Sequence, residues 1–212
     1  MTAAEKQRRL TRLIEALSRG RRGDREASEL IGRFGSYGRA LAAHPSALKT
    51  SGLTDAEALL IATLPALARR VALEAFGPAP RLGDDEALCA YVRALYTGVS
   101  REKLTLCCLS AQGALAGRYT VAEGTDAALS FQPRQLAELA IRSGAPKVVL
   151  CHNHPHGREA FSEADIQTTR AAVGYLRAMD IELSDHLLVT GGAVISMRRS
   201  GPAGRLVFDD RA

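Results

Sequence analysis

A strand-to-helix segment, residues 148–179, constrains the fold of this 212-residue chain more than any other stretch. The apolar run Val148-Val149-Leu150 predicts a buried strand, and apolar residues from Ile166 to Met179 at near-helical spacing predict a helix. Between them lies a polar stretch that begins Cys151-His152-Asn153-His154-Pro155. Because strands that alternate with helices are typical of α/β domains, this segment favours that fold class.

The same stretch carries side chains that can bind a metal ion. Residues i and i+2 of an extended chain point the same way, so His152 and His154 can present both imidazoles to one point. If the loop folds back, Asp165 adds a carboxylate, and two histidines with one acid and an open fourth position are typical of catalytic zinc. Ser162-x-x-Asp165 also resembles a capping box, in which the serine caps a helix. The metal-ligand and helix-cap interpretations both stay open at this point.

The surplus of positive charge lies in the first part of the chain. The net charge is +5; residues 1–80 carry 13 basic and 8 acidic side chains, and residues 81–212 carry 15 of each. A basic helical module indicates an anionic partner, with nucleic acid the first candidate, or else a solvated helical face. No stretch approaches the ~20 apolar residues that span a bilayer, and the N-terminus has no apolar signal region. We therefore expect a cytoplasmic protein with no membrane partner.

The cysteines give no sign of a disulfide framework or of a zinc ribbon. None of them is spaced as CxxC, and two are neighbours on an apolar strand, where they would point to opposite faces. We expect reduced, buried residues at all four positions, which are Cys89, Cys107, Cys108 and Cys151.

Residues 1–76 are expected to form a small all-helical domain. Apolar residues on one face predict a helix over 3–19, shorter helices follow, and a long helix ends near Ala75. The glycine turn of residues 49–55 resembles a helix-hairpin-helix module, a DNA-backbone binder, but Thr54 stands where such hairpins usually carry a second glycine. Residues 77–83 are dense in turn formers and predict a linker to a second domain, residues 84–212.

The second domain is expected to alternate strands with helices around a mixed sheet. The predicted helices cover residues 84–95, 133–142 and 163–179, and the predicted strands cover 104–109, 116–122, 147–152, 181–189 and 193–197.

The spacing His152-x-His154, seven residues, then Ser162-x-x-Asp165 resembles the signature of the JAB/MPN metalloprotease family, the JAMM motif. His-Asn-His-Pro with a downstream Asp185-His186-Leu187 is more closely similar to the RadC (UPF0758) branch, over residues 84–200. The resemblance implies an α/β, JAB/MPN (cytidine-deaminase-like) mixed-sheet domain preceded by a helix-hairpin-helix-like domain.

The chain departs from the RadC pattern at several positions. The loop at residues 156–161 lacks the usual later prolines, and its His156 is expected to be a surface histidine. Gln132-Pro133-Arg134-Gln135 replaces a usual His-Pro-Arg-Glu, and Asp126 or Ala127 replaces an asparagine.

The resemblance also implies roles for individual residues. His152, His154 and Asp165 would ligate one Zn²⁺ per chain, with water in the fourth place. A carboxylate from an upstream strand edge would take the water proton; Glu102 is our choice and Glu123 the fallback. Ser162 would stabilise the tetrahedral state as an oxyanion donor or, alternatively, cap the helix. Asp185-His186 would orient a ligand or form a strand-end pair without a catalytic role.

Two functions therefore compete at the level of sequence. The first is a zinc-dependent metallohydrolase of JAMM type, which cleaves a peptide or isopeptide bond of an unidentified protein or peptide substrate by a zinc-activated water. The alternative is a DNA-associated accessory protein, in line with the DNA-repair label of RadC proteins, with a structural or inactive metal site and nucleic acid bound by the basic helices. An HNH nuclease is excluded, because such enzymes spread His, Asn and His over a hairpin and a helix, whereas here the three residues are contiguous.

Overall fold

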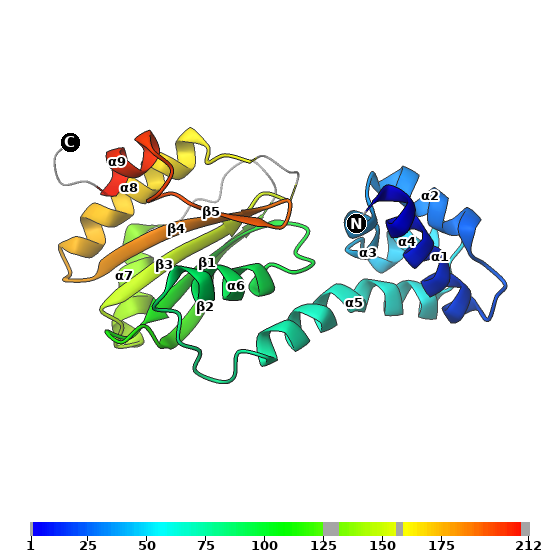
Figure 1. The fold of residues 1–212 in the computed structure, drawn as a ribbon, viewed down its shortest axis with the longest axis horizontal. Helices are drawn as coiled ribbons and strands as arrows, with labels where there is room; N and C mark the ends of the chain where they lie inside the picture. The colour runs from blue at the N-terminus through cyan, green and yellow to red at the C-terminus, as the bar shows by residue number, and fades with distance from the viewer. Residues whose placement is uncertain (1, 125–131, 156–158, 209–212) are drawn as a thin grey trace. The chain divides into compact units, whose positions relative to one another are not determined.

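A computed structural model of the chain describes residues 2–124, 132–155 and 159–208 (Figure 1). The chain divides into two compact units, Met1–Val71 and Ala72–Ala212. The elements are α1 (Ala3–Ser18), α2 (Asp24–Phe34), α3 (Tyr37–Leu41), α4 (Pro45–Lys49), α5 (Asp55–Glu74), α6 (Asp85–Leu95), β1 (Glu102–Leu109), β2 (Leu115–Gly124), α7 (Pro133–Arg142), β3 (Lys147–Asn153), α8 (Glu163–Arg177), β4 (Glu182–Thr190), β5 (Ala193–Ser196) and α9 (Pro202–Phe208). The division falls inside α5, and the expected linker at residues 77–83 stays a prediction.

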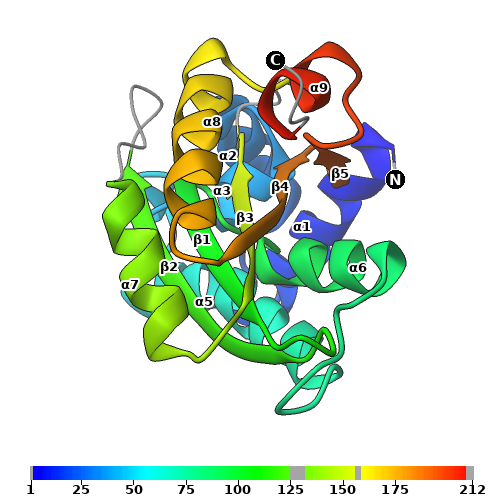
Figure 2. The same cartoon turned by 90° about the vertical axis from the view of Figure 1, so that its left-hand side faces the viewer.

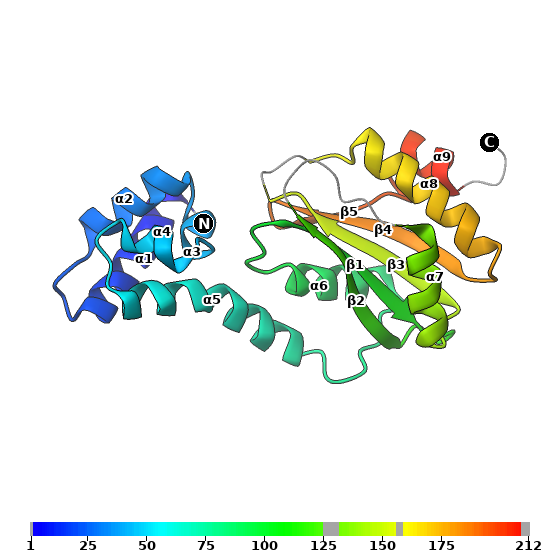
Figure 3. The ribbon, with the colours of Figure 1, turned by 180° about the vertical axis from the view of Figure 1, so that it is seen from behind.

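The first unit is a helical cluster, with α1 to α4 gathered beside the start of α5 (Figure 3). Its α1 begins with a capping box, in which the Thr2 hydroxyl accepts from the Glu5 backbone and the Glu5 carboxylate accepts from the Thr2 backbone. The apolar face of α1 buries Leu10 and Ile14 against residues of the other four helices. Burial of that face holds the short helices together, since isolated helices of this length are marginal in water.

The second unit is built on a five-stranded sheet of order β2-β1-β3-β4-β5. Only β3 and β4 pair in parallel, and α8 connects them. One face of the sheet packs against α7 and α8 and the other against α6 (Figure 2). Because β3 is the central strand and is covered on both sides, Val148 to Asn153 are all buried. The mixed α/β fold predicted from the sequence is therefore confirmed.

A register shift between β3 and β4 decides which residues of β4 face α8. Val148 pairs with Leu183, but Val149 pairs with Asp185, so Ser184 is an extra residue on β4. A bulge of this kind reverses the alternation of side chains. His186 therefore lies opposite Leu150 on the α7–α8 face, and Asp185 lies on the α6 face.

Helix α9 was not predicted from the sequence. It is short and packs against α8. A side chain at Gly204 would meet the carbonyl oxygen of Arg198, so only glycine permits this close approach. The Arg198 guanidinium lies 4.6 Å from the ring centre of Phe208. The helix thus depends on tertiary contacts, which a periodicity argument does not detect.

The cysteines agree with expectation except at one position. All four are free thiols, and Cys107 and Cys108 lie in the two separate core layers of the sheet. Cys89 was expected to be buried and is only half-buried. Of the helices that the structure describes, none combines the length and the apolar composition of a segment that crosses a membrane.

Candidate metal centre

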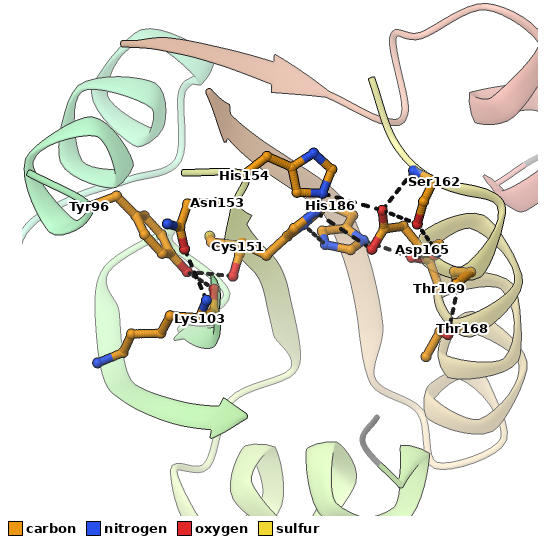
Figure 4. Close-up of polar contacts among 12 residues, drawn as sticks. Tyr96, Lys103, Cys151, Asn153, His154, Ser162, Asp165, Thr168, Thr169 and His186 are labelled. Atoms are coloured by element: carbon orange, nitrogen blue, oxygen red, sulfur yellow. Dashed lines mark hydrogen bonds and ion pairs between the residues drawn. The ribbon is translucent and has the colours of Figure 1, made fainter. Parts of the chain in front are cut away.

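The structure brings His152, His154 and Asp165 together where β3 ends and α8 begins (Figure 4). The two histidine Nε2 atoms lie 3.0 Å apart. The Asp165 oxygens lie 3.6 Å from Nε2 of His152 and 3.7 Å from Nε2 of His154. The backbone of His154 still donates to the Val189 carbonyl of β4, which holds this residue beyond the end of β3. The three residues form a possible metal-binding triad.

The mutual distances fit one small cation. Ligand atoms bonded at about 2.0–2.2 Å to a tetrahedral Zn²⁺ lie roughly 3.4 Å from one another. The two Nε2 atoms are 3.0 Å apart, and each lies 3.6 or 3.7 Å from a different oxygen of the Asp165 carboxylate. One ligand atom from each of the three residues lies within 4.8 Å of the other two. The donor set, two imidazole nitrogens and a carboxylate, is one that zinc commonly takes in enzymes. The side chains present therefore fit the ion that the resemblance implies.

Burial favours the neutral form of His152 and of His186, the histidine behind it. His152 is 1% exposed, and desolvation lowers its pKa from 6.5 to about 4. The Asp165 carboxylate opposes this shift but does not outweigh burial. Burial also lowers the pKa of His186 well below its usual value. The Phe161 ring, 5.7 Å from the ring of His152 and 5.3 Å from that of His186, adds an apolar cover.

Ser162 and Asp165 form the capping box that the sequence allowed. The Ser162 hydroxyl accepts from the Asp165 backbone N–H at 3.1 Å and lies 2.6 Å from Oδ2 of Asp165. The Ser162 backbone N–H donates to the same Oδ2 at 2.7 Å. The cap therefore holds the carboxylate in place, so one motif both starts α8 and orients the acid of the triad.

Glu102 and Glu123 lie on the paired strands β1 and β2, at the end of the sheet where His152 lies, but on different faces. Leu104 pairs with His152, and side chains two residues apart share a face, so Glu102 lies on the face of His152. Glu123 pairs with Lys103, and the two side chains form an ion pair of 3.8 Å. Lys103 alternates with Glu102, which places the Glu123 pair on the opposite face.

Asn153 connects the end of β3 to the start of β1, a role that the sequence did not indicate. Its Nδ2 donates to the Arg101 carbonyl, and its Oδ1 accepts from the Lys103 N–H, each at 3.0 Å. Residues 101 and 103 flank Glu102, so the Asn153 side chain continues the strand ladder and fixes the backbone of Glu102. On the same side, the Tyr96 hydroxyl donates to the Cys151 carbonyl at 2.6 Å.

Asp185 and His186 take different positions, which the sequence left open. Asp185 is 8% exposed and accepts from the Ser196 hydroxyl and from the backbone N–H groups of Arg198 and His186. Burial nevertheless raises its pKa. His186 faces the triad, and its Nε2 lies 2.8 Å from Nδ1 of His152. The other ring nitrogen, Nδ1, lies 2.7 Å from the Thr169 hydroxyl.

Thr169 was not singled out from the sequence. It lies four residues after Asp165, and residues i and i+4 of a helix share a face. That spacing is the signal that could have pointed to it.

A cavity of about 280 Å³ opens beside His154. Its wall comes from the end of α6, from the end of β3 and from the turn between β4 and β5, with Tyr96, Asn153, Gly191 and Gly192 among the lining residues. A space of this size beside His154 is large enough for a short stretch of peptide. The expected surface histidine His156, and Asp126 and Ala127, lie outside the described residues.

Comparison with known proteins gives a consistent result. Residues 82–202 match the family model described as RadC-like JAB domain. A UPF0758 protein of Bordetella petrii is 32% identical over 87% of this chain and 82% of that protein. A UPF0758 protein of Bordetella parapertussis is 33% identical over 82% of this chain and 77% of its own length. A UPF0758 protein of Delftia acidovorans is 31% identical over 83% and 78%, respectively. These names denote a family and no activity.

Proposed function

Because this chain belongs to the RadC-like JAB domain family (UPF0758), we propose that it is a zinc-dependent metallohydrolase that cleaves a peptide or isopeptide bond. The observation that carries the proposal is the convergence of two imidazoles and one carboxylate, whose ligand atoms, one from each residue, lie within 4.8 Å of one another. His152, His154 and Asp165 would hold the ion. When bound, zinc supplies Lewis-acid chemistry, which lowers the pKa of water toward ~7 and polarises a carbonyl group.

Glu102 is the general base of the proposed reaction. Its strand position puts it on the face of His152, and Asn153 holds the residues on either side of it. The carboxylate takes a proton from the attacking water and passes it to the leaving amine, a step that contributes about 10²–10⁴-fold in rate. Glu123 is the weaker candidate, since it pairs with Lys103 on the other face of the sheet.

The one hydroxyl proton of Ser162 has two proposed acceptors, the Asp165 carboxylate and a developing oxyanion, whereas the helix cap uses the lone pair of the same oxygen. In the structure the hydroxyl lies 2.6 Å from Oδ2 of Asp165 and caps α8. To donate to a developing oxyanion, the proton has to leave that carboxylate, whose Oδ2 keeps the backbone N–H of Ser162. We propose that this switch accompanies the tetrahedral state, while the backbone contact holds the ligand geometry.

The cavity beside His154 is the proposed binding place for the substrate. Its wall contains Gly191 and Gly192, which have positive φ angles in the turn that joins β4 to β5. The lack of side chains there leaves room for an extended peptide backbone. The substrate class is therefore a peptide segment that lies across the ends of β3 and β4, with its scissile carbonyl at the triad.

A zinc and hydrolysis assay tests the proposal. We expect stoichiometric zinc in the purified wild-type chain, and a His154→Ala variant should lose most of it; a His44→Ala variant, at an exposed histidine of the first unit, serves as control. A peptide library analysed by mass spectrometry should yield cleavage products only with zinc present. Glu102→Gln should lower that cleavage about 10²–10⁴-fold and keep the zinc, whereas Glu123→Gln should keep both.

Two outcomes would contradict the proposal. One is a zinc content that is low in the wild type and does not change in His154→Ala. The other is cleavage by Glu102→Gln at the wild-type rate with zinc bound.

The geometry of the first unit gives the DNA-binding alternative little support. In a helix-hairpin-helix, backbone N–H groups at the glycine turn meet a phosphate. Here the N–H of Thr54 donates to Glu57, and the N–H of Glu57 donates to the Thr54 hydroxyl. The Glu57 carboxylate, which is ion-paired with Arg22 at 2.8 Å, also puts negative charge at the start of α5. The proposed hydrolase is therefore favoured.

A further inference from the structure

One chain of contacts near the triad has no part in the proposed reaction. It runs from the carbonyl oxygen of Asp165 through the Thr169 hydroxyl and the two nitrogens of His186 to Nδ1 of His152 (Figure 4). The links measure 2.5, 2.7 and 2.8 Å. The chain begins in the first turns of α8, crosses to β4 and ends on β3.

The direction of the first link is fixed by chemistry. A carbonyl oxygen only accepts hydrogen bonds, so the Thr169 hydroxyl donates its single proton to Asp165. The oxygen of Thr169 can then only accept from His186. It follows that Nδ1 of His186 carries a hydrogen.

The remaining links follow from the first. A neutral imidazole has one N–H, so His186 with hydrogen on Nδ1 presents a lone pair at Nε2. That lone pair accepts from Nδ1 of His152, which must therefore carry the hydrogen. Nε2 of His152 is left with a lone pair, and this atom faces His154 and Asp165. The opposite polarity of the chain would put a hydrogen on Nε2 of His152 and block its use as a ligand.

Burial shields the chain from competition by water. Thr169 is 0% exposed, His152 1% and His186 2%. The three groups form one network of single-donor, single-acceptor links, in which each bond direction depends on its neighbour. The hydroxyl of Thr169 is the group that sets the direction of the whole chain.

We propose that Thr169, acting through His186, is a positioning residue that holds His152 in the tautomer with Nε2 available to a metal ion. The inference rests on the proposed metal site of the hydrolase. It adds a function to α8 beyond supplying Asp165. The carboxylate of Asp165 would bind the ion, and its backbone carbonyl sets the direction of the hydrogen bonds that lead to His152. The bulge at Ser184 has a part in this role, because it turns His186 toward Thr169.

Three variants separate the proposed role from simple packing. Thr169→Val keeps the shape and removes the hydroxyl, and Thr169→Ser keeps the hydroxyl. Thr168→Val is the matched control, because Thr168 makes the same kind of bond to a carbonyl one turn earlier, at Ala164, and is only half-buried. The readouts are the protonation of the ring nitrogens in ¹⁵N spectra of the metal-free protein and zinc affinity in competition with a chelator.

We expect metal-free wild type, Thr169→Ser and Thr168→Val to show His152 with hydrogen on Nδ1. Thr169→Val should show a mixture of tautomers and about 10- to 100-fold weaker zinc binding, the usual effect of removing a group that orients a metal ligand. Hydrogen on Nε2 of His152 in the metal-free wild type overturns the inference, whether or not any variant folds. Wild-type spectra and zinc affinity in Thr169→Val overturn it as well.

The same data distinguish this inference from the proposed function. A wild-type protein that binds no zinc sinks the hydrolase proposal, while its ring-nitrogen spectra still decide the role of Thr169. A wild-type protein that binds zinc and a Thr169→Val variant that binds it equally well sink only the role of Thr169.

Discussion

At His152, burial favours the neutral imidazole, which is the form that binds a metal ion, and the same burial lowers the stability of the folded state in acid. Its ring is buried among His154, His186 and Phe161, so the neutral form is favoured and the pKa falls to about 4. An unfolded chain would protonate the same ring at its usual pKa of 6.5. The difference makes the folded state of the metal-free protein sensitive to acid.

The pH dependence has a definite sign. Between pH 6.5 and about 4 the unfolded chain binds more protons at His152 than the folded chain, so stability rises with pH there and falls on acidification. When the pH is lowered from 7 to 5, we expect the unfolding free energy of the metal-free protein to fall by about 2 kcal/mol because of His152. Urea unfolding followed by circular dichroism at the two pH values measures it. His186 contributes in the same direction.

Two variants check that assignment. His152→Asn should reduce the difference between pH 7 and pH 5 by most of this amount. His44→Gln, which changes an exposed histidine of the first unit, should leave it unchanged. An equal pH dependence in His152→Asn and wild type would show that other groups carry the effect.

At the scale of elements, the bulge at Ser184 decides that Asp185 lies on the α6 face of the sheet and His186 on the α7–α8 face. On the α6 face the Asp185 carboxylate accepts hydrogen bonds from the Ser196 hydroxyl of β5 and from the backbone N–H of Arg198. These bonds tie β4 to β5 and to the segment that leads into α9. The raised pKa of Asp185 shows that burial of the carboxylate costs free energy, which the three donors only partly offset.

Removal of this carboxylate should loosen the edge of the sheet. Asp185→Ala leaves two backbone N–H groups and one hydroxyl without their acceptor, which should cost about 3 kcal/mol of unfolding free energy. Asp85→Ala is the control: Asp85 is also paired, with Arg199, but the pair is exposed and should cost no more than about 1 kcal/mol. Chemical denaturation of the two variants and the wild type measures both losses of unfolding free energy. Equal losses in the two variants would contradict the anchoring role.

Most of these elements could be predicted from local sequence. The capping box at Ser162 marks the start of α8, and the apolar run before His152 marks the central strand. Helix α9 and the bulge in β4 could not be predicted, because both depend on partners distant in sequence: the Arg198 carbonyl that Gly204 approaches, and the pairing of β4 with β3.

At the scale of the whole molecule, the charge and the candidate metal centre belong to different parts of the chain. The surplus of basic side chains lies within residues 1–80, whereas all three triad residues lie in the second unit. The two candidate functions therefore depend on different residues and can be tested separately.

A charge reversal in the first unit should separate the two candidate functions. The triple change Arg8→Glu, Arg9→Glu, Arg12→Glu alters exposed side chains of α1. We expect unchanged zinc content and peptide cleavage, and any DNA binding that the wild type shows should become weaker and less salt-dependent, since phosphate contacts follow local positive charge. Zinc content and a salt titration of DNA binding measure the two effects. A loss of zinc in the triple variant would contradict the separation.

The sequence by itself determined the α/β class, the family and the three residues that converge, because these follow from local periodicity and fixed spacing around His152. Only the tertiary structure decided which neighbours support them. Glu102 rather than Glu123 shares the face of His152, and His186 rather than Asp185 turns toward Thr169. The physical reason is strand register: a shift of one residue moves every later side chain to the other face of the sheet, and pairing between distant strands sets that register.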